Sequence, residues 1–65
     1  RLQELERAME RLQAEERALL LLYYWQEKPV DEIARITGLS VANVKTKLFR
    51  TRKKLFVLLK TMEEE

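Results

Sequence analysis

The stretch EIARITGLSVANVKTKL, residues 32–48, predicts two helices joined by a tight turn. Its Gly38 is the one glycine of the chain, and glycine favours the left-handed backbone conformation that ends a helix. Ser40 follows as a good N-cap for a second helix. Small or apolar side chains occupy the positions at which two crossing helices would pack: Ile33, Ala34, Leu39, Val44 and Leu48. A short glycine-containing turn between two helices is the basis of a helix-turn-helix.

The rest of the chain also favours helices. Residues 2–12 space their apolar side chains by three or four positions, and residues 14–26 form a second helical pattern. No Gly, Pro, Ser, Thr, Asp or Asn separates these segments, so local chemistry leaves open whether they form one helix or two. Pro29 ends the second pattern, and further helices are expected over residues 30–37 and 41–62. The prediction is a small all-α domain of three or four helices with a helix-turn-helix and a long C-terminal recognition helix.

Length and composition exclude several functions. The 65 residues are expected to form a single domain, residues 1–65, and the start at an arginine suggests a fragment of a longer protein. The chain has no cysteine and no histidine, which argues against disulfides, metal sites and most acid–base catalysis. Because the helix dipole explains the acids at the helix starts, no enzyme, cofactor or small-molecule substrate is expected. The longest apolar run is too short to span a bilayer and no leader is recognisable, so a cytoplasmic protein without a membrane partner is expected.

Charge is distributed unevenly along the chain. Residues 1–32 contain five basic and eight acidic side chains, whereas residues 33–62 contain eight basic ones and no acidic one. A one-sided basic block is typical of nucleic-acid binding. On charge alone, a solvated helix face or a helix lying on a membrane surface remains an equal alternative.

Helical periodicity divides the last predicted helix into two faces. At about 100° per residue, one side collects the expected core residues Val41, Val44, Leu48, Leu55, Leu59 and Met62. The opposite side collects Ala42, Asn43, Thr46, Arg50 and Lys53, with Phe49 at its flank. Arg50 can bond guanine with both arms of its guanidinium, Thr46 can bond a base edge, and Phe49 can contact a thymine methyl group. The flanking groups suit backbone phosphates: Lys45, Lys47, Arg52, Lys54, and Ser40 with the amides at the helix start.

Several of these residues have a second interpretation. Phe49 could be the rim of the core, Asn43 could bond only the helix start, and Lys45 could extend along the core edge without a ligand. Arg35 and Lys60 are expected to be solvent-exposed charges rather than contacts.

The run LLLLYYWQ, residues 19–26, is apolar on all sides of a helix. Such a helix either lies at the centre of the core or exposes one side to a partner. We expect Leu19, Leu22 and Tyr23 to face the core. The candidates for a partner surface are Leu20, Leu21, Tyr24 and Trp25, although burial of the whole run is an equal alternative.

Residues 15–55 resemble region 4 of bacterial sigma factors, and most of all the extracytoplasmic-function group. The segments DEIA, GLSVANVK and TKLFRTRKKL carry the resemblance. It implies a four-helix domain whose last helix binds the minus-thirty-five promoter element while RNA polymerase holds the complex. By position, the resemblance assigns base and adjacent phosphate contacts to Lys45, Thr46, Phe49 and Arg50. It places three residues near phosphate contacts: Ser40, Lys47 and Lys53.

The resemblance also implies partners and a location. The domain would dock on the flap of the polymerase β subunit and be masked by an anti-sigma factor. The exposed part of residues 20–25 and the first helix would make these contacts. The implied location is the cytoplasm, at the bacterial nucleoid. Family members often have a proline where this chain has Gln13, so a break between the first two helices is expected by analogy, whereas local propensity favours a continuous helix. LuxR-type response regulators share part of the pattern but tend to carry a histidine that this chain lacks, and they rank second. A protein-interaction module with an acidic partner is the third interpretation.

Overall fold

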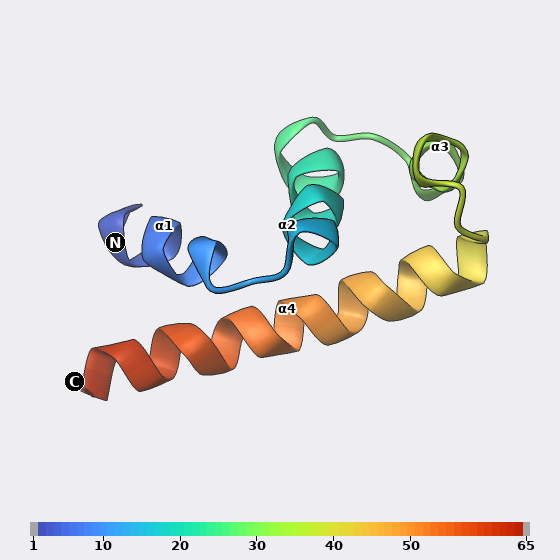
Figure 1. Ribbon diagram of the computed structural model, residues 1–65. Helices are drawn as coiled ribbons and strands as arrows, with labels where there is room; N and C mark the ends of the chain where they lie inside the picture. The colour runs from blue at the N-terminus through green and yellow to red at the C-terminus, as the bar shows by residue number, and fades with distance from the viewer. Residues whose placement is uncertain (1, 65) are drawn as a thin grey trace.

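The computed structural model describes residues 2–64, and its regular elements within that range are all helices. They are α1 (Leu2–Glu10), α2 (Ala14–Leu20) with the π-helical turn η1 (Leu21–Trp25), α3 (Val30–Thr37) and α4 (Val41–Glu64). Figure 1 shows their order along the molecule. The predicted all-α fold with a long last helix is therefore confirmed.

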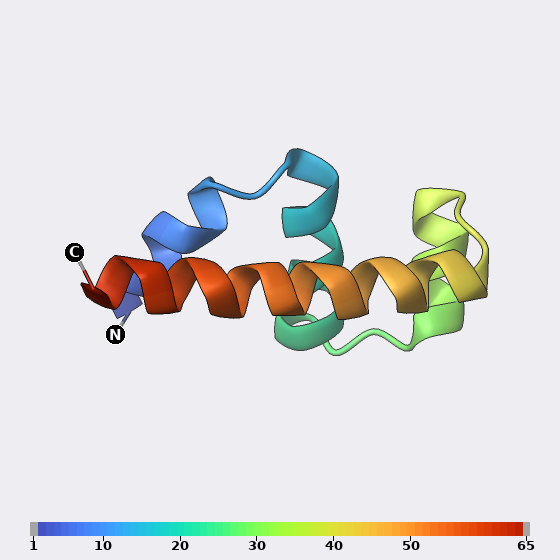
Figure 2. The same ribbon diagram turned by 90° about the horizontal axis from the view of Figure 1, so that it is seen from below.

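Helix α4 is the spine of the domain. Its 24 residues rise about 36 Å, nearly the whole 38 Å length of the molecule. In Figure 1, α1, α2 and α3 all lie on one side of this rod, with α3 at its N-terminal end and α1 at its C-terminal end. Figure 2, seen from below, shows that the opposite face of α4 is not covered by another helix. One side of the long helix is therefore available to a ligand along its full length.

The chain breaks between α1 and α2, as the resemblance implied and against the continuity that local propensity favoured. Gln13 is the extended residue before α2, and its backbone amide donates a 2.9 Å hydrogen bond to the Glu16 carboxylate. This bond is one half of a capping box, which satisfies an amide that the helix itself leaves without a partner. The Arg17 guanidinium donates to the Met9 and Leu12 carbonyl oxygens at 3.2 and 3.1 Å. Arg17 therefore ties the end of α1 to α2.

The predicted helix 14–26 is present, but its second half is wider than an α-helix. The Gln26 amide donates to the Leu21 carbonyl oxygen at 3.0 Å, a spacing of five residues that defines a π-turn. Glu27 then adopts a positive φ of 55°, which the sequence did not indicate. Such turns displace the following side chains from the ordinary helical spacing, so periodicity alone cannot place them.

The turn between α3 and α4 follows the prediction closely. Gly38 has a left-handed φ of 80°, and its amide donates to the Ala34 carbonyl oxygen at 2.9 Å. The Ser40 hydroxyl oxygen accepts the Asn43 amide at 3.0 Å and caps α4. Leu39 packs against the core from the turn. These contacts confirm the predicted helix-turn-helix geometry.

The core lies between α4 and the other three helices. Its fully buried large side chains are Leu19, Leu20, Ile33 and Val44. Burial of Leu20, 1% exposed, corrects its prediction as a partner-surface residue. The reason is that α2 crosses α4 between α1 and α3 (Figure 2), so two successive leucines are enclosed instead of one.

Two further predictions about burial were wrong. Val41, expected in the core, is 40% exposed because it is the first residue of α4, at the end of the rod. Tyr23, expected to face the core, is 37% exposed on η1. Thr51, which the helical periodicity did not assign to the core, is 2% exposed.

Candidate nucleic-acid interface

The uncovered side of α4 carries the side chains that were predicted to contact bases. Asn43, Lys45, Thr46, Phe49 and Arg50 are all exposed. On the opposite side, Val44 and Leu48 are buried, with exposures of 0 and 7%. The helix therefore separates its two faces as the periodicity predicted, while the individual DNA contacts remain predictions.

Phe49 belongs to the exposed face and not to the rim of the core. It is 55% exposed, and the Lys53 ammonium group lies 5.2 Å from the centre of its ring. A cation over an aromatic face is attracted by the ring quadrupole, and the contact at an exposed site is worth about 0.5–1 kcal/mol. Lys53 therefore restrains Phe49 on the surface while keeping its own positive charge exposed.

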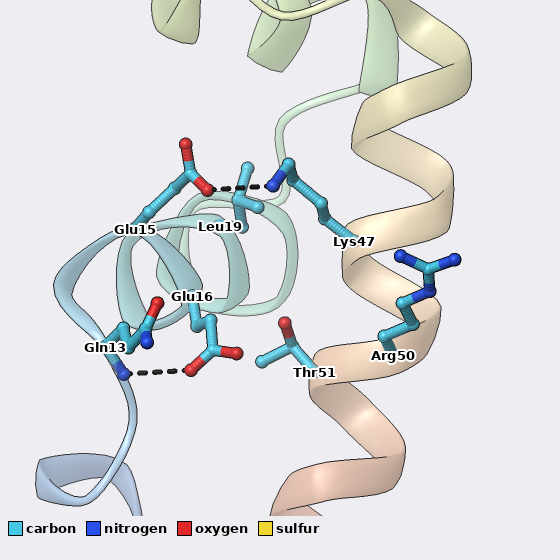
Figure 3. A pocket seen from close by; sticks show the side chains of 7 residues that line it. All are labelled: Gln13, Glu15, Glu16, Leu19, Lys47, Arg50 and Thr51. Carbon is cyan, nitrogen blue, oxygen red and sulfur yellow. Dashed lines mark hydrogen bonds and ion pairs between the residues drawn. The ribbon is translucent and has the colours of Figure 1, made fainter.

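One edge of this face is paired with acids at the start of α2. Lys47 Nζ lies 3.1 Å from Glu15 Oε1, and Lys54 Nζ lies 3.1 Å from Glu16 Oε1. Figure 3 shows Glu15 and Lys47 reaching toward each other across a hollow of about 180 Å³ that Thr51 also lines. No pattern in the sequence predicts these pairs, because their partners lie more than thirty positions apart on different helices.

Glu16 is held in its charged form by this arrangement. The hydrogen bond from the Gln13 backbone amide is the largest cause, and it lowers the pKa of the Glu16 carboxyl below its ordinary value. Burial is the next largest influence and raises this pKa, while the hydrogen bond and charge of Lys54 and the charge of Lys47 lower it. The acid therefore remains an anion beside the two lysines at neutral pH.

The other edge of the face meets η1. The Arg52 guanidinium donates a hydrogen bond to the Tyr24 hydroxyl. Lys45 and Arg52 line a hollow together with Tyr23 and Phe49. Because tyrosine is neutral, Arg52 is positioned by this bond without losing its charge.

The remaining phosphate candidates are exposed near these two edges. Ser40 lies at the N-terminus of α4, with its hydroxyl already used in the cap. Lys53 lies on the uncovered side beside Phe49. All five predicted phosphate-contacting residues therefore lie on or beside one face of one helix, at the positions Ser40, Lys47, Arg52, Lys53 and Lys54.

A further apolar surface lies on η1. Leu21, Tyr24 and Trp25 are 39, 43 and 55% exposed, as predicted for a partner surface, whereas Leu20 is not. The ring of Tyr24 meets the ring of Tyr23 edge-on, with 4.9 Å between their centres. Beside Trp25 is a hollow of about 520 Å³, whose apolar lining is Leu2, Leu5, Met9, Leu21 and Trp25.

Membrane-spanning helices and clusters of metal-binding side chains are both absent from residues 2–64. In the described range, no helix combines the length and apolar character needed to cross a bilayer. Nor do three or more acidic side chains gather there in a way that could hold a metal ion.

Comparison with known proteins identifies the family. Residues 2–55 match the family model described as sigma-70, region 4, which covers most of the chain. No curated protein and no solved structure matches the chain. The match favours the sigma interpretation over the LuxR-type alternative, and this family consists of DNA-binding regulatory domains rather than enzymes. The helix-turn-helix has an uncovered basic helix, and the family match runs from α1 into α4. The chain therefore belongs to the sigma-70 region 4 family, the DNA-binding domain with which sigma factors recognise promoters.

Proposed function

We propose that this domain binds the minus-thirty-five promoter element as region 4 of an extracytoplasmic-function sigma factor, in the cytoplasm at the bacterial nucleoid. The uncovered face of α4 supports the proposal most directly. Thr46 and Arg50 are exposed on α4, and residues 33–62 contain no acidic side chain that would repel DNA. Side chains on that face can reach base edges, while the cations at its edges meet phosphates.

The size of the domain sets the expected strength of binding. A single DNA-binding module buries only about 600–1,000 Å² of protein surface, so the isolated chain should bind weakly and depend on polymerase for affinity. Base readout should depend most on Arg50, because a guanidinium forked onto guanine is worth about 1–3 kcal/mol of discrimination. Within residues 2–64, Arg50 forms no ion pair that would divert it.

Selection of bound duplexes from a random pool tests the proposal, followed by binding measurements on the selected sequence and its single-base variants. Arg50→Ala should lose about 1–3 kcal/mol on the selected duplex and relax the choice at one base pair. Lys60→Ala is the matched control, because it removes one exposed cation from the same helix about 15 Å further along. Equal losses for Arg50→Ala on every sequence would show that Arg50 contacts only phosphate, and failure to select any sequence would contradict the proposal.

A second function is supported by the exposed aromatic surface. We propose that Leu21, Tyr24 and Trp25 dock on the β flap of RNA polymerase or on an anti-sigma factor. Exposed tryptophan and tyrosine beside an apolar hollow are the side chains that most often dominate protein–protein binding. Leu21 and Trp25 lie on η1, whereas the DNA-facing side chains lie on α4, so both surfaces can act together. Tyr24, bonded to Arg52, lies where the two surfaces meet.

A further inference from the structure

Two lysines at the edge of the DNA-facing surface already have carboxylate partners within the chain. Lys47 pairs with Glu15, and Lys54 pairs with Glu16 through both carboxylate oxygens, at 3.1 and 3.4 Å. The two lysines are seven positions apart, nearly two helical turns, so they project toward the same start of α2. Figure 3 shows that Glu15 and Glu16 stand beside each other opposite α4.

The other cations of this surface differ. In the described part of the chain, Lys45, Arg50, Arg52 and Lys53 form no ion pair. Arg52 is bonded to a neutral tyrosine hydroxyl, and Lys53 lies over an aromatic ring. Ion pairing is therefore confined to one edge, although Arg50 lines the same hollow as Glu15 and Glu16.

We propose that Glu15 and Glu16 are internal counterions of the DNA-binding face. They compete with phosphate oxygens for Lys47 and Lys54 and weaken the part of DNA binding that is independent of sequence. Among the described residues, neither acid forms an ion pair with Arg50, although Arg50 lines the same hollow, so base contacts are weakened less than the phosphate contacts of Lys47 and Lys54. This inference rests on the proposed function, because it concerns the same surface.

The salt dependence of binding gives the size of the effect. Each phosphate that a cation neutralises contributes about 0.9 to the slope of log affinity against log salt. Four contacting cations (Lys47, Arg52, Lys53 and Lys54) would give a slope of about −3.6. When a lysine exchanges its carboxylate partner for a phosphate, the freed glutamate attracts a cation from the salt. The exchange therefore releases no net cation and adds nothing to the slope. With both lysines exchanging in this way, the slope should lie nearer about −1.8.

The test measures binding of the whole chain to a random-sequence duplex by fluorescence anisotropy, between about 50 and 200 mM salt. The double variant Glu15→Gln, Glu16→Gln should bind this duplex more tightly at the lowest salt, by about 1.5-fold to fivefold for each acid removed. Its slope should steepen toward about −3.6. Glutamine at position 16 can still accept the Gln13 amide, so the start of α2 is retained.

Glu6→Gln is the matched control, because it makes the same charge change on exposed α1, at a residue without an ion pair in the described range. A double variant that behaves like two such remote changes, with an unaltered slope, would overturn the inference. The inference would also be overturned if Glu15→Gln and Glu16→Gln tightened DNA binding equally in a chain that already carries Lys47→Gln and Lys54→Gln. In that chain the acids have no lysine partners that could be released to bind phosphate. If the unchanged chain and every variant fail to bind DNA while remaining helical, the proposed function fails, and this inference fails with it.

Discussion

Replacing Leu20 with alanine should destabilise the domain strongly, whereas replacing its neighbour Leu21 should not. Leu20 is 1% exposed within the core, and Leu21 is 39% exposed. A fully buried leucine cut to alanine costs about 2–5 kcal/mol, including the cavity that remains. A domain of 65 residues has only about 3–10 kcal/mol of stability in total, so the loss is a large fraction of it.

Urea unfolding followed by far-ultraviolet circular dichroism measures this difference. Leu20→Ala should lose about 3 kcal/mol, which lowers the midpoint of thermal unfolding by roughly 12–24 °C. Leu21→Ala makes the same chemical change at a partly exposed position and should lose less than about 1.5 kcal/mol. Equal losses for the two variants would refute the burial of Leu20 in the core.

Measuring both unfolding and polymerase binding for Trp25→Ala and Leu20→Ala separates stability from docking. Trp25→Ala removes a side chain that is 55% exposed, so its effect on unfolding should be well below that of Leu20→Ala. Binding to polymerase core should nevertheless weaken by about 2 kcal/mol or more, roughly thirtyfold, if Trp25 is an anchor of the interface. Leu20→Ala, measured below its unfolding temperature, should retain polymerase binding. If Trp25→Ala lost more stability than Leu20→Ala while Leu20→Ala lost polymerase binding, the burial of Leu20 and the exposure of Trp25 would both be contradicted.

Two further predictions concern the helix starts and ends. Gly38→Ala should destabilise the domain by about 1–2 kcal/mol in urea unfolding, because the backbone φ of 80° is unfavourable for alanine. Steric crowding does not contribute, since no atom lies within 4 Å of an added Cβ. An unchanged stability would show that the turn adopts another conformation. The pKa of Glu16 is lower in the folded chain than its ordinary value of 4.5, so its contribution to stability is complete above about pH 4.5 and is lost as pH falls through the lowered value. Glu16→Gln should remove that part of the pH dependence, and an identical pH profile of unfolding would contradict the Gln13 and Lys54 contacts.

The sequence by itself determined the helix-turn-helix and the face of α4. Gly38 and Ser40 act through the backbone of their own neighbours, so their effect is readable without knowing the rest of the fold. The alternation of Val44 and Leu48 with Thr46 and Arg50 likewise depends only on the period of one helix. These local signals led to the family that the match over residues 2–55 established.

Only the tertiary structure decided which parts of the other elements are covered. Leu20 sits in a run that is apolar all round, and such a run has no periodic face to show which side is enclosed. Its burial follows from the crossing of α2 over α4, and the exposure of Val41 follows from its place at the end of the rod. The pairing of Lys47 and Lys54 with acids of α2 has the same origin, because opposite charges distant in sequence attract strongly only when packing brings them within a few ångströms.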